Sequence, residues 1–240
     1  MKSSDQDRHY LEAEADAFFQ RNHADGDPRT LRPSKRRMWE ILVEAGVRPK
    51  RVLEFGCQYG DLLDHLTRET GAECVGVEPS QRAVDLGNEV YEGRVRLFQG
   101  TLADNPISAD PKSAGRFDLV LVDDVFCWVS WETLFQSVAN VDEALADDGT
   151  LFLTEFFPLA NRRNRNHHVS EADVWCYKPA PGHLGMFTAS GLYEVIWQKV
   201  WLDGDDAFVK DRKADAFESR WSTSLLRKSV TGYYQEPSGP

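Results

Sequence analysis

Cysteine is scarce in this 240-residue chain, and its cysteines lie far apart. No CxxC pair occurs, so neither a zinc site nor the disulfide framework of a small secreted domain is indicated. We therefore expect reduced thiols and no bound metal. The four positions are Cys57, Cys74, Cys127 and Cys176.

Long hydrophobic runs are also missing. No apolar stretch approaches the roughly 18 to 20 residues that a membrane-spanning helix needs. The first ten residues, MKSSDQDRHY, are polar and lack the apolar middle segment of a signal peptide. Both absences predict a soluble, cytoplasmic protein that does not act in a membrane.

Positive charge is in short supply. The chain has 28 Lys and Arg residues against 39 Asp and Glu residues, a formal net charge of −11. Nonspecific binding to nucleic acid or to an anionic membrane depends on a cationic surface, so this balance disfavours both. We expect a small-molecule partner, and the sequence does not decide between a monomer and a homodimer.

Short apolar strands alternate with helical segments through the middle of the chain. The expected strands are 51–55, 74–78, 95–99, 117–123 and 151–157, and the expected helices are 61–70, 80–91 and 131–145. Nearly uniformly apolar strands separated by helices are typical of an α/β fold with a parallel sheet covered on both faces.

The two ends of the chain differ from this pattern. Residues 5–22 have apolar residues at helical spacing, and Ser34 is the expected N-cap of a second helix that Gly46 ends. Near the C-terminus, residues 193–201 and 222–229 are strand-like and predict an antiparallel edge. We expect an N-terminal helical cap over 1–50, a cofactor-binding core over 51–160, and a substrate-side loop with C-terminal strands over 161–240.

The first strand runs into a turn with the sequence VLEFGCQYGD, residues 52–61. Gly56 and Gly60 allow a positive φ or a close approach of the backbone to a ligand. The turn departs from the dinucleotide pattern GxGxxG, because Gln58 and Asp61 occupy its second and third glycine positions. A carboxylate at Asp61 would repel a diphosphate, whereas Glu54 suits a cationic amine. The turn therefore predicts a ligand with positive charge and no phosphate.

A second acid, Glu78, ends the next strand in the motif GVEPS. It follows Gly56 at about the ~20-residue separation of an acid that binds a ribose diol. A nucleoside with a cationic tail describes S-adenosylmethionine.

These motifs, with FDLVLVDDVFCWV and DDGTLFLTEF, resemble in order and spacing the Rossmann-like S-adenosylmethionine-dependent methyltransferases over about residues 50–160. The resemblance implies a three-layer α/β fold with a mainly parallel seven-stranded sheet. It also implies cofactor-binding roles for a set of residues. Glu54 and the turn from Gly56 through Cys57 to Gly60 would hold the methionine part, Glu78 and Pro79 the ribose, Thr101 and Leu102 the adenine, and Asp123 would lie beside the cofactor.

Two positions depart from the family pattern. Gln58 replaces the usual middle glycine, and Thr101 stands where an acid often contacts adenine. The tail, with NHHV, YKP and ASGLYEVI, also resembles bacterial methyltransferases that act on sugars and natural products.

Several residues have a structural interpretation beside the functional one. Gly56 and Gly60 could simply shape the turn, Cys57 could pack in the core, and Asp123 could cap a loop, with Asp124 the weaker candidate. Lys35, with the basic residues after it, is typical of a solvated helix face, although cations in a first helical turn also suit an anionic ligand.

His167 and His168 follow the fifth strand, where a substrate should approach the methyl group. Adjacent histidines usually have exposed side chains, and no HxxxH spacing supports a metal. We predict a general base or a substrate-binding role for this pair, with Asp123 the other catalytic candidate.

The sequence thus predicts an enzyme that transfers the sulfonium methyl group to an oxygen or nitrogen of a small acceptor, such as a sugar or a natural-product intermediate. The acceptor pocket is expected to draw on aromatic residues of the two ends, which are Phe18, Phe19, Trp175, Tyr177, Trp197 and Trp201. A non-catalytic S-adenosylmethionine-binding scaffold and a related nucleoside-cofactor transferase are the alternatives.

Overall fold

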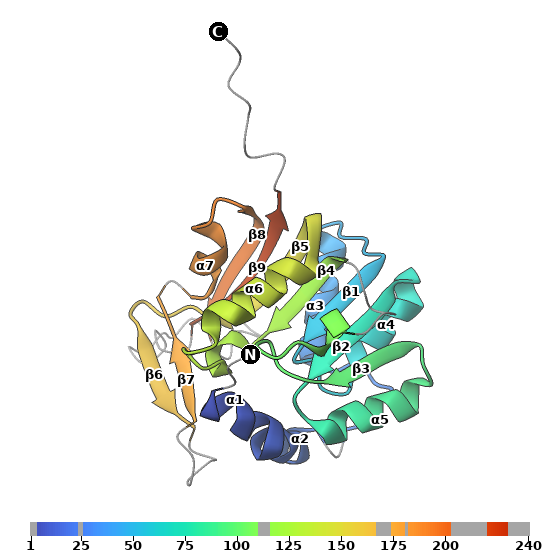
Figure 1. The fold of residues 1–240 in the computed structure, drawn as a ribbon. Helices are drawn as coiled ribbons and strands as arrows, with labels where there is room; N and C mark the ends of the chain where they lie inside the picture. Colours follow the sequence, from blue (N-terminus) through green and yellow to red (C-terminus); the bar gives the residue numbers. More distant parts are fainter. Residues whose placement is uncertain are drawn as a thin grey trace.

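A computed structural model describes residues 4–23, 26–109, 116–166, 174–180, 182–202 and 220–229. A seven-stranded sheet forms its centre, in the order β3-β2-β1-β4-β5-β9-β8 (Figure 1). The strands are β1 Arg51–Phe55, β2 Glu73–Glu78, β3 Val95–Gln99, β4 Phe117–Asp123, β5 Leu145–Phe156, β8 Tyr193–Leu202 and β9 Arg220–Lys228.

The sheet is parallel from β3 to β5 and antiparallel at its other edge. Register pairs such as Val52 with Cys74 and Val52 with Leu119 join β1 to both neighbours in parallel. Strand β9 runs antiparallel to β5 and to β8. The predicted mainly parallel sheet with an antiparallel C-terminal edge is confirmed.

Helices cover both faces of the sheet. One face packs on α3 Pro33–Glu44, α4 Asp61–Thr70 and α5 Gln81–Tyr91, and the other on α6 Leu134–Ala144 and α7 Leu184–Thr188. Successive strand residues alternate between the two cores: Val52 belongs to the first and Leu53 to the second, and both are fully buried. Burial on both faces explains why these strands are apolar throughout.

The N-terminal segment forms a cap near the carboxyl ends of the strands (Figure 1). It consists of α1 Asp5–His9, a π-helical turn at Tyr10–Glu14 (η1) and α2 Ala15–Asn22. Polar contacts tie it to the core: Gln6 Nε2 donates to the carbonyl oxygens of Trp128 and Trp175, at 2.7 and 2.9 Å. Asp16 accepts a hydrogen bond of 2.7 Å from the hydroxyl of Ser80. These bonds fix the cap over the sheet.

Smaller elements complete the described part of the chain. Short 3-10 turns lie at Pro106–Ala109 (η2) and Phe126–Trp128 (η3), and a separate two-stranded sheet pairs β6 Arg162–Arg165 with β7 Trp175–Lys178. No helix in the described ranges has both the length and the apolar character needed to cross a membrane.

Two helix starts differ from the prediction. Helix α3 begins at Pro33 with Arg32 in the N-cap position, so the prediction of Ser34 as N-cap is wrong. Proline fits the first helical position because its missing N–H needs no partner there. Helix α6 begins at Leu134, three residues later than expected, because residues 131–133 form a turn.

Candidate functional site

A pocket of about 430 Å³ lies at the carboxyl ends of the central strands. Its lining comes from the turn after β1, the end of β2, the loop after β3, the end of β4, and the N-terminal cap. This volume lies in the range of small-molecule sites, and the edge of the sheet is where open α/β folds bind ligands.

The turn after β1 depends on left-handed backbone conformations. Gly56 has φ +73°, and a Cβ added to it would lie 2.5 Å from Cγ2 of Val125. Gln58 has φ +53°, a conformation that costs energy for a residue other than glycine. The backbone N–H of Gln58 donates a hydrogen bond of 2.9 Å to Oε2 of Glu78. This bond explains how glutamine holds the place of the family's middle glycine.

Glu78 lies at the end of β2 and is almost fully buried. Its Oε1 accepts a hydrogen bond of 3.0 Å from the amide of Ser80, so each carboxylate oxygen has one backbone donor. Burial raises the pKa of Glu78 to about 7, and the two amide hydrogen bonds only partly oppose that increase. Each oxygen keeps a further acceptor position, and the residue lines the pocket.

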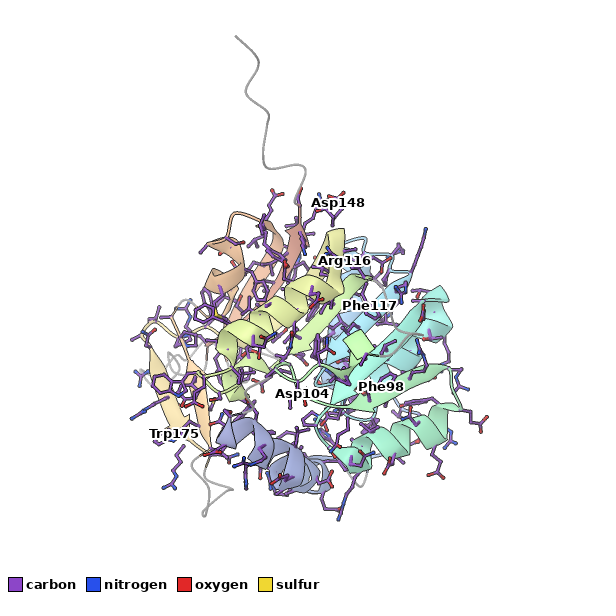
Figure 2. All side chains as sticks on the ribbon, in the orientation of Figure 1. Phe98, Asp104, Arg116, Phe117, Asp148 and Trp175 are labelled. Carbon is purple, nitrogen blue, oxygen red and sulfur yellow. The ribbon has the colours of Figure 1, made fainter. Side chains whose placement is uncertain are left out.

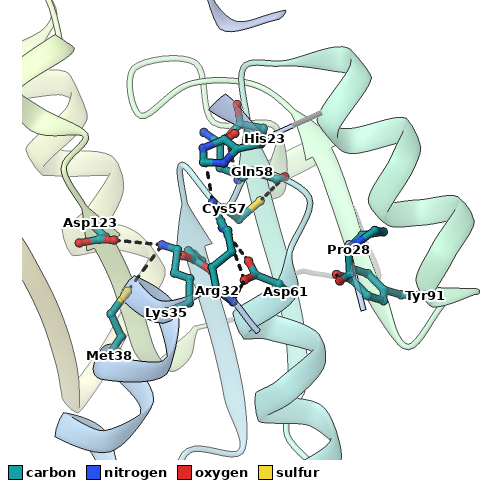
Figure 3. Close-up of polar contacts among 12 residues, drawn as sticks. His23, Pro28, Arg32, Lys35, Met38, Cys57, Gln58, Asp61, Tyr91 and Asp123 are labelled. Carbon is teal, nitrogen blue, oxygen red and sulfur yellow. Dashed lines mark hydrogen bonds and ion pairs between the residues drawn. The ribbon is translucent and has the colours of Figure 1, made fainter. Parts of the chain in front are cut away.

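Lys35 is buried, which corrects its predicted place on a solvated helix face. Its Nζ lies 2.8 Å from Oε1 of Glu54 and 3.1 Å from Oδ2 of Asp123 (Figure 3). Burial opposes its charge, but Glu54 and Asp123 together raise the pKa of Lys35 above its ordinary value. The other oxygen of Glu54, Oε2, is buried without a hydrogen-bond partner among the described residues. A cation therefore stands at the floor of the pocket between two acids.

Asp61 is neutralised by Arg32. The guanidinium donates from Nη2 to Oδ1 at 2.6 Å and from Nε to Oδ2 at 3.0 Å (Figure 3). Although burial favours the neutral acid, these hydrogen bonds hold the pKa of Asp61 below its ordinary value. Arg32 also lines the pocket beside His23, whose pKa falls to about 4 because it is buried and close to Arg32. The expected repulsion between Asp61 and a phosphate is therefore weakened by a paired cation.

The end of β4 carries two acids in different surroundings. Asp123 faces Lys35, whereas Asp124 accepts a hydrogen bond of 3.2 Å from the thiol of Cys127. Glu155 on β5 lies nearby and accepts hydrogen bonds from the amides of Val125 and Phe126. Possible ligand atoms of Asp124, Cys127 and Glu155 lie within 4.8 Å of one another, and these hydrogen bonds already engage all three.

The pocket lining is mixed in character. Part of it is formed by Pro79 and the loop Gly100–Leu102, which Asn140 fixes by donating to the carbonyl oxygen of Leu102 at 2.6 Å. The lining also includes four aromatic side chains from separate segments, which are Tyr10, Phe18, Trp128 and Trp221. The ring centroids of Tyr10 and Trp128 lie 6.1 Å apart.

Most of the predicted cofactor residues meet in this pocket. Those that line it are Gly56, Glu78, Pro79, Thr101, Leu102 and Asp123. Three others do not line it: Glu54 on β1 and Cys57 in the turn are fully buried, and Gly60 is the N-cap of α4, next to Leu97. His167 and His168 lie outside the described residues.

The aromatic prediction was only partly met. Phe18 lines the pocket, but Phe19, Trp175, Tyr177 and Trp197 do not, and the side chain of Trp201 lies outside the described part of the chain. Trp175 lies on β7 at the side of the molecule, against Arg163 (Figure 2). Some pocket residues had no role in the predicted cofactor or acceptor site. They include Tyr10, His23, Arg32, Lys35, Trp128 and Trp221. A signal was available for Lys35 alone, as a cation in a first helical turn that opposes the macrodipole.

Known proteins were compared with this chain in sequence and in structure. A family model described as a methyltransferase domain matches residues 20–199. A search of curated protein sequences gave no match. The structure of 1,6-didemethyltoxoflavin-N1-methyltransferase from Burkholderia thailandensis, with S-adenosylhomocysteine bound, matches with a TM-score of 0.64 and 17% identity over 95% of this chain and 92% of that chain.

Two further solved structures share the fold. The N-methyltransferase NodS from Bradyrhizobium japonicum, in complex with S-adenosylhomocysteine, has a TM-score of 0.58 and 14% identity over 89% of this chain and 98% of its own. The cyclase SpnF has a TM-score of 0.57 and 14% identity, with 86% of each chain covered. Because the family model matches most of the chain, this protein belongs to the S-adenosylmethionine-dependent methyltransferases, as its motifs predicted.

Proposed function

We propose that the protein transfers a methyl group from S-adenosylmethionine to an oxygen or nitrogen of a small molecule, such as a sugar or natural-product intermediate. One observation carries this proposal. The lining of one pocket includes the glycine turn and Glu78, which suit the cofactor, and aromatic side chains that suit a second small molecule.

The residues of the pocket fit the cofactor. Glu78 has a free acceptor position on each oxygen for a ribose hydroxyl, and the absence of a Cβ at Gly56 keeps the floor of the pocket open. Lys35 is the candidate to bind the carboxylate of the methionine part, because it lines the pocket as a cation between Glu54 and Asp123. Pro79 and Leu102 provide apolar surfaces for the adenine.

When bound, the cofactor supplies an activated methyl group on a sulfonium centre. The chain's own contribution is to hold the acceptor in line with that methyl group and to exclude water, and positioning alone can provide much of the rate. The walls formed by Tyr10, Trp128 and Trp221 serve this role. His167, His168 and Asp123 remain our candidates for a general base where the acceptor must lose a proton.

The names of the structural neighbours are compatible with a small acceptor. The toxoflavin enzyme was solved with 1,6-didemethyltoxoflavin, and both it and NodS are N-methyltransferases. Their low identity to this chain supports a shared fold and leaves the acceptor of this protein to experiment.

The alternative is a protein that keeps the fold without methyl transfer, or a related transferase that uses another nucleoside cofactor. The neighbour SpnF supports keeping this alternative to methyl transfer, because SpnF is a cyclase with the same fold. A fold shared across activities does not by itself determine the reaction.

The test has two stages. Calorimetry with S-adenosylhomocysteine measures cofactor binding, and mass spectrometry then follows label from methyl-labelled S-adenosylmethionine into a panel of glycosylated and aromatic metabolites. Binding together with label transfer supports the proposal. Binding of S-adenosylhomocysteine without label transfer to any component of the panel favours the non-catalytic alternative. A failure to bind S-adenosylhomocysteine removes the cofactor assignment.

A further inference from the structure

We propose that Asp124 binds the nitrogen of the acceptor and accepts its proton, so that the substrate is an amine carried on an aromatic or other planar group. This inference rests on the proposed function and narrows it. Asp124 lines the pocket next to Asp123, at the end of β4.

The backbone holds Asp124 in an unfavourable conformation. Its φ of +58° lies in the left-handed region, which costs a non-glycine residue on the order of 1 to 3 kcal/mol. Its amide donates a hydrogen bond of 2.9 Å to the carbonyl oxygen of Thr154, and its Oδ1 accepts the thiol of Cys127 at 3.2 Å. Strained backbone that the surrounding structure maintains occurs often at functional sites, and Asp124 is one of the residues that line the pocket.

Asp124 lacks both the cation that pairs with Asp123 and the pair of backbone amides that donate to Glu155. Lys35 pairs with Asp123, and two backbone amides pair with Glu155. Within the described part of the chain no cationic side chain forms an ion pair with Asp124. Burial, together with the negative charge of Glu155, raises the pKa of Asp124 well above its ordinary range. This shift favours the protonated acid in the unliganded pocket, and a bound cation would favour the carboxylate.

The aromatic lining of the pocket favours the same ligand. The faces of aromatic rings attract cations, and tryptophan does so most strongly. Tyr10 and Trp128 pack together, and Trp221 packs against Phe156 in a tilted arrangement with ring centroids 3.9 Å apart. An acid without a partner cation, in a pocket that aromatic rings also line, matches an ammonium group better than a neutral hydroxyl.

The chemistry balances with groups already present. Asp124 loses its proton to solvent when the ammonium group binds. An N–H bond of the ammonium then breaks as an O–H bond forms on Asp124, which leaves a lone pair on nitrogen. That lone pair forms the new N–C bond while the C–S bond breaks and its electron pair stays on sulfur. A raised pKa makes the Asp124 carboxylate a stronger base for this transfer.

The experiment uses the full chain saturated with S-adenosylhomocysteine, so that cofactor binding is established first. Three matched pairs serve as probes: 2-phenylethylamine with 2-phenylethanol, tryptamine with tryptophol, and benzylamine with benzyl alcohol. Calorimetry at pH 7 in two buffers of different ionisation enthalpy gives both the affinity and the number of protons released. We expect each amine to bind about tenfold or more tightly than its alcohol, as for a charge-assisted hydrogen bond, with release of up to about one proton.

Asp124→Asn is the variant, and Asp85→Asn is the matched control because Asp85 is exposed on α5. The amine preference and the proton release should disappear in Asp124→Asn and persist in Asp85→Asn. Equal or tighter binding of the alcohols, no binding by either series, or proton release that survives in Asp124→Asn would overturn the inference while S-adenosylhomocysteine still binds. If Asp124→Asn does not fold, the amine preference of the wild-type protein decides the matter: amines that bind no more tightly than their alcohols overturn the inference. A wild-type protein that fails to bind S-adenosylhomocysteine overturns the proposed function itself.

Discussion

Lys35 Nζ lies 2.8 Å from Oε1 of Glu54, and this contact joins the first turn of α3 to the middle of the sheet. The same ammonium reaches Oδ2 of Asp123 at 3.1 Å. Glu54 is fully buried, and only a small fraction of Lys35 is exposed. One cation therefore compensates acids from two neighbouring strands at the point where the pocket begins.

Replacing Lys35 by methionine should destabilise the protein by about 3 to 5 kcal/mol, because a buried acid is left without its cation. Urea unfolding measures this change. Arg36→Met is the control, since Arg36 is exposed on the same helix, and it should change stability by less than about 0.5 kcal/mol. Adding Glu54→Gln to Lys35→Met should recover part of the lost stability, because the buried charge is then removed as well. Equal stability of the Lys35 and Arg36 variants would contradict the buried ion pair.

Gly56→Ala should weaken binding of S-adenosylhomocysteine by about tenfold or more, because the new Cβ would lie 2.5 Å from Val125 at the floor of the pocket. Gly46 is a matched control: its φ is +72° and nothing lies within 4 Å of its Cβ position. Both variants should lose about 1 kcal/mol of stability from the positive φ. Calorimetry should separate them, and adding Val125→Ala should restore affinity to Gly56→Ala. Equal affinity of the two single variants would remove the steric argument.

The sequence was sufficient for the parallel strands and for the acid at the end of β2, because both leave local signals. Apolar runs identify the strands, and the position of Glu78 follows from its separation from Gly56. Residues 51–55, 95–99 and 117–123 match the observed strands.

The charge pairing could not be predicted from the sequence because its partners are distant. Lys35 meets an acid 19 positions away and another 88 positions away, and Arg32 meets Asp61 after 29 positions. A local pattern places a lysine in the first turn of a helix on the solvated face. Only the packing of α3 against the sheet reverses that placement. The aromatic lining of the pocket was missed for the same reason, since Tyr10, Trp128 and Trp221 come from three distant segments.

Affinity for S-adenosylhomocysteine should fall as the pH drops below about 7, the raised pKa of Glu78. Ribose hydroxyls donate to the ionised carboxylate, so binding favours loss of the proton, and affinity should be about tenfold lower at pH 6 than at pH 8. The effect on folding has the opposite sign. Because the folded pKa is above the unfolded value, Glu78 contributes stability at low pH that is lost as the pH rises through about 7.

Glu78→Gln tests this assignment because it keeps the shape and removes the titration. Its affinity should be low and nearly independent of pH between 6 and 8. Glu73→Gln serves as the control, since Glu73 is exposed at the opposite end of the same strand. A pH profile that stays unchanged in Glu78→Gln would assign the titration to another group.

Replacement of His167 or His168 by asparagine should lower turnover by about 10²- to 10⁴-fold if that residue acts as the general base, because a base acts in the transition state. The affinity for S-adenosylhomocysteine should stay nearly constant. Wild-type activity should fall below a pKa near the ~6.5 of free histidine, since only neutral imidazole accepts a proton, and this acid limb should vanish in the responsible variant. Steady-state kinetics from pH 5 to 9, with an acceptor that the protein methylates, measures both effects. If both single variants keep wild-type turnover and an unchanged profile, proton removal passes to Asp123, Glu155 or Asp124, or the reaction proceeds by positioning alone.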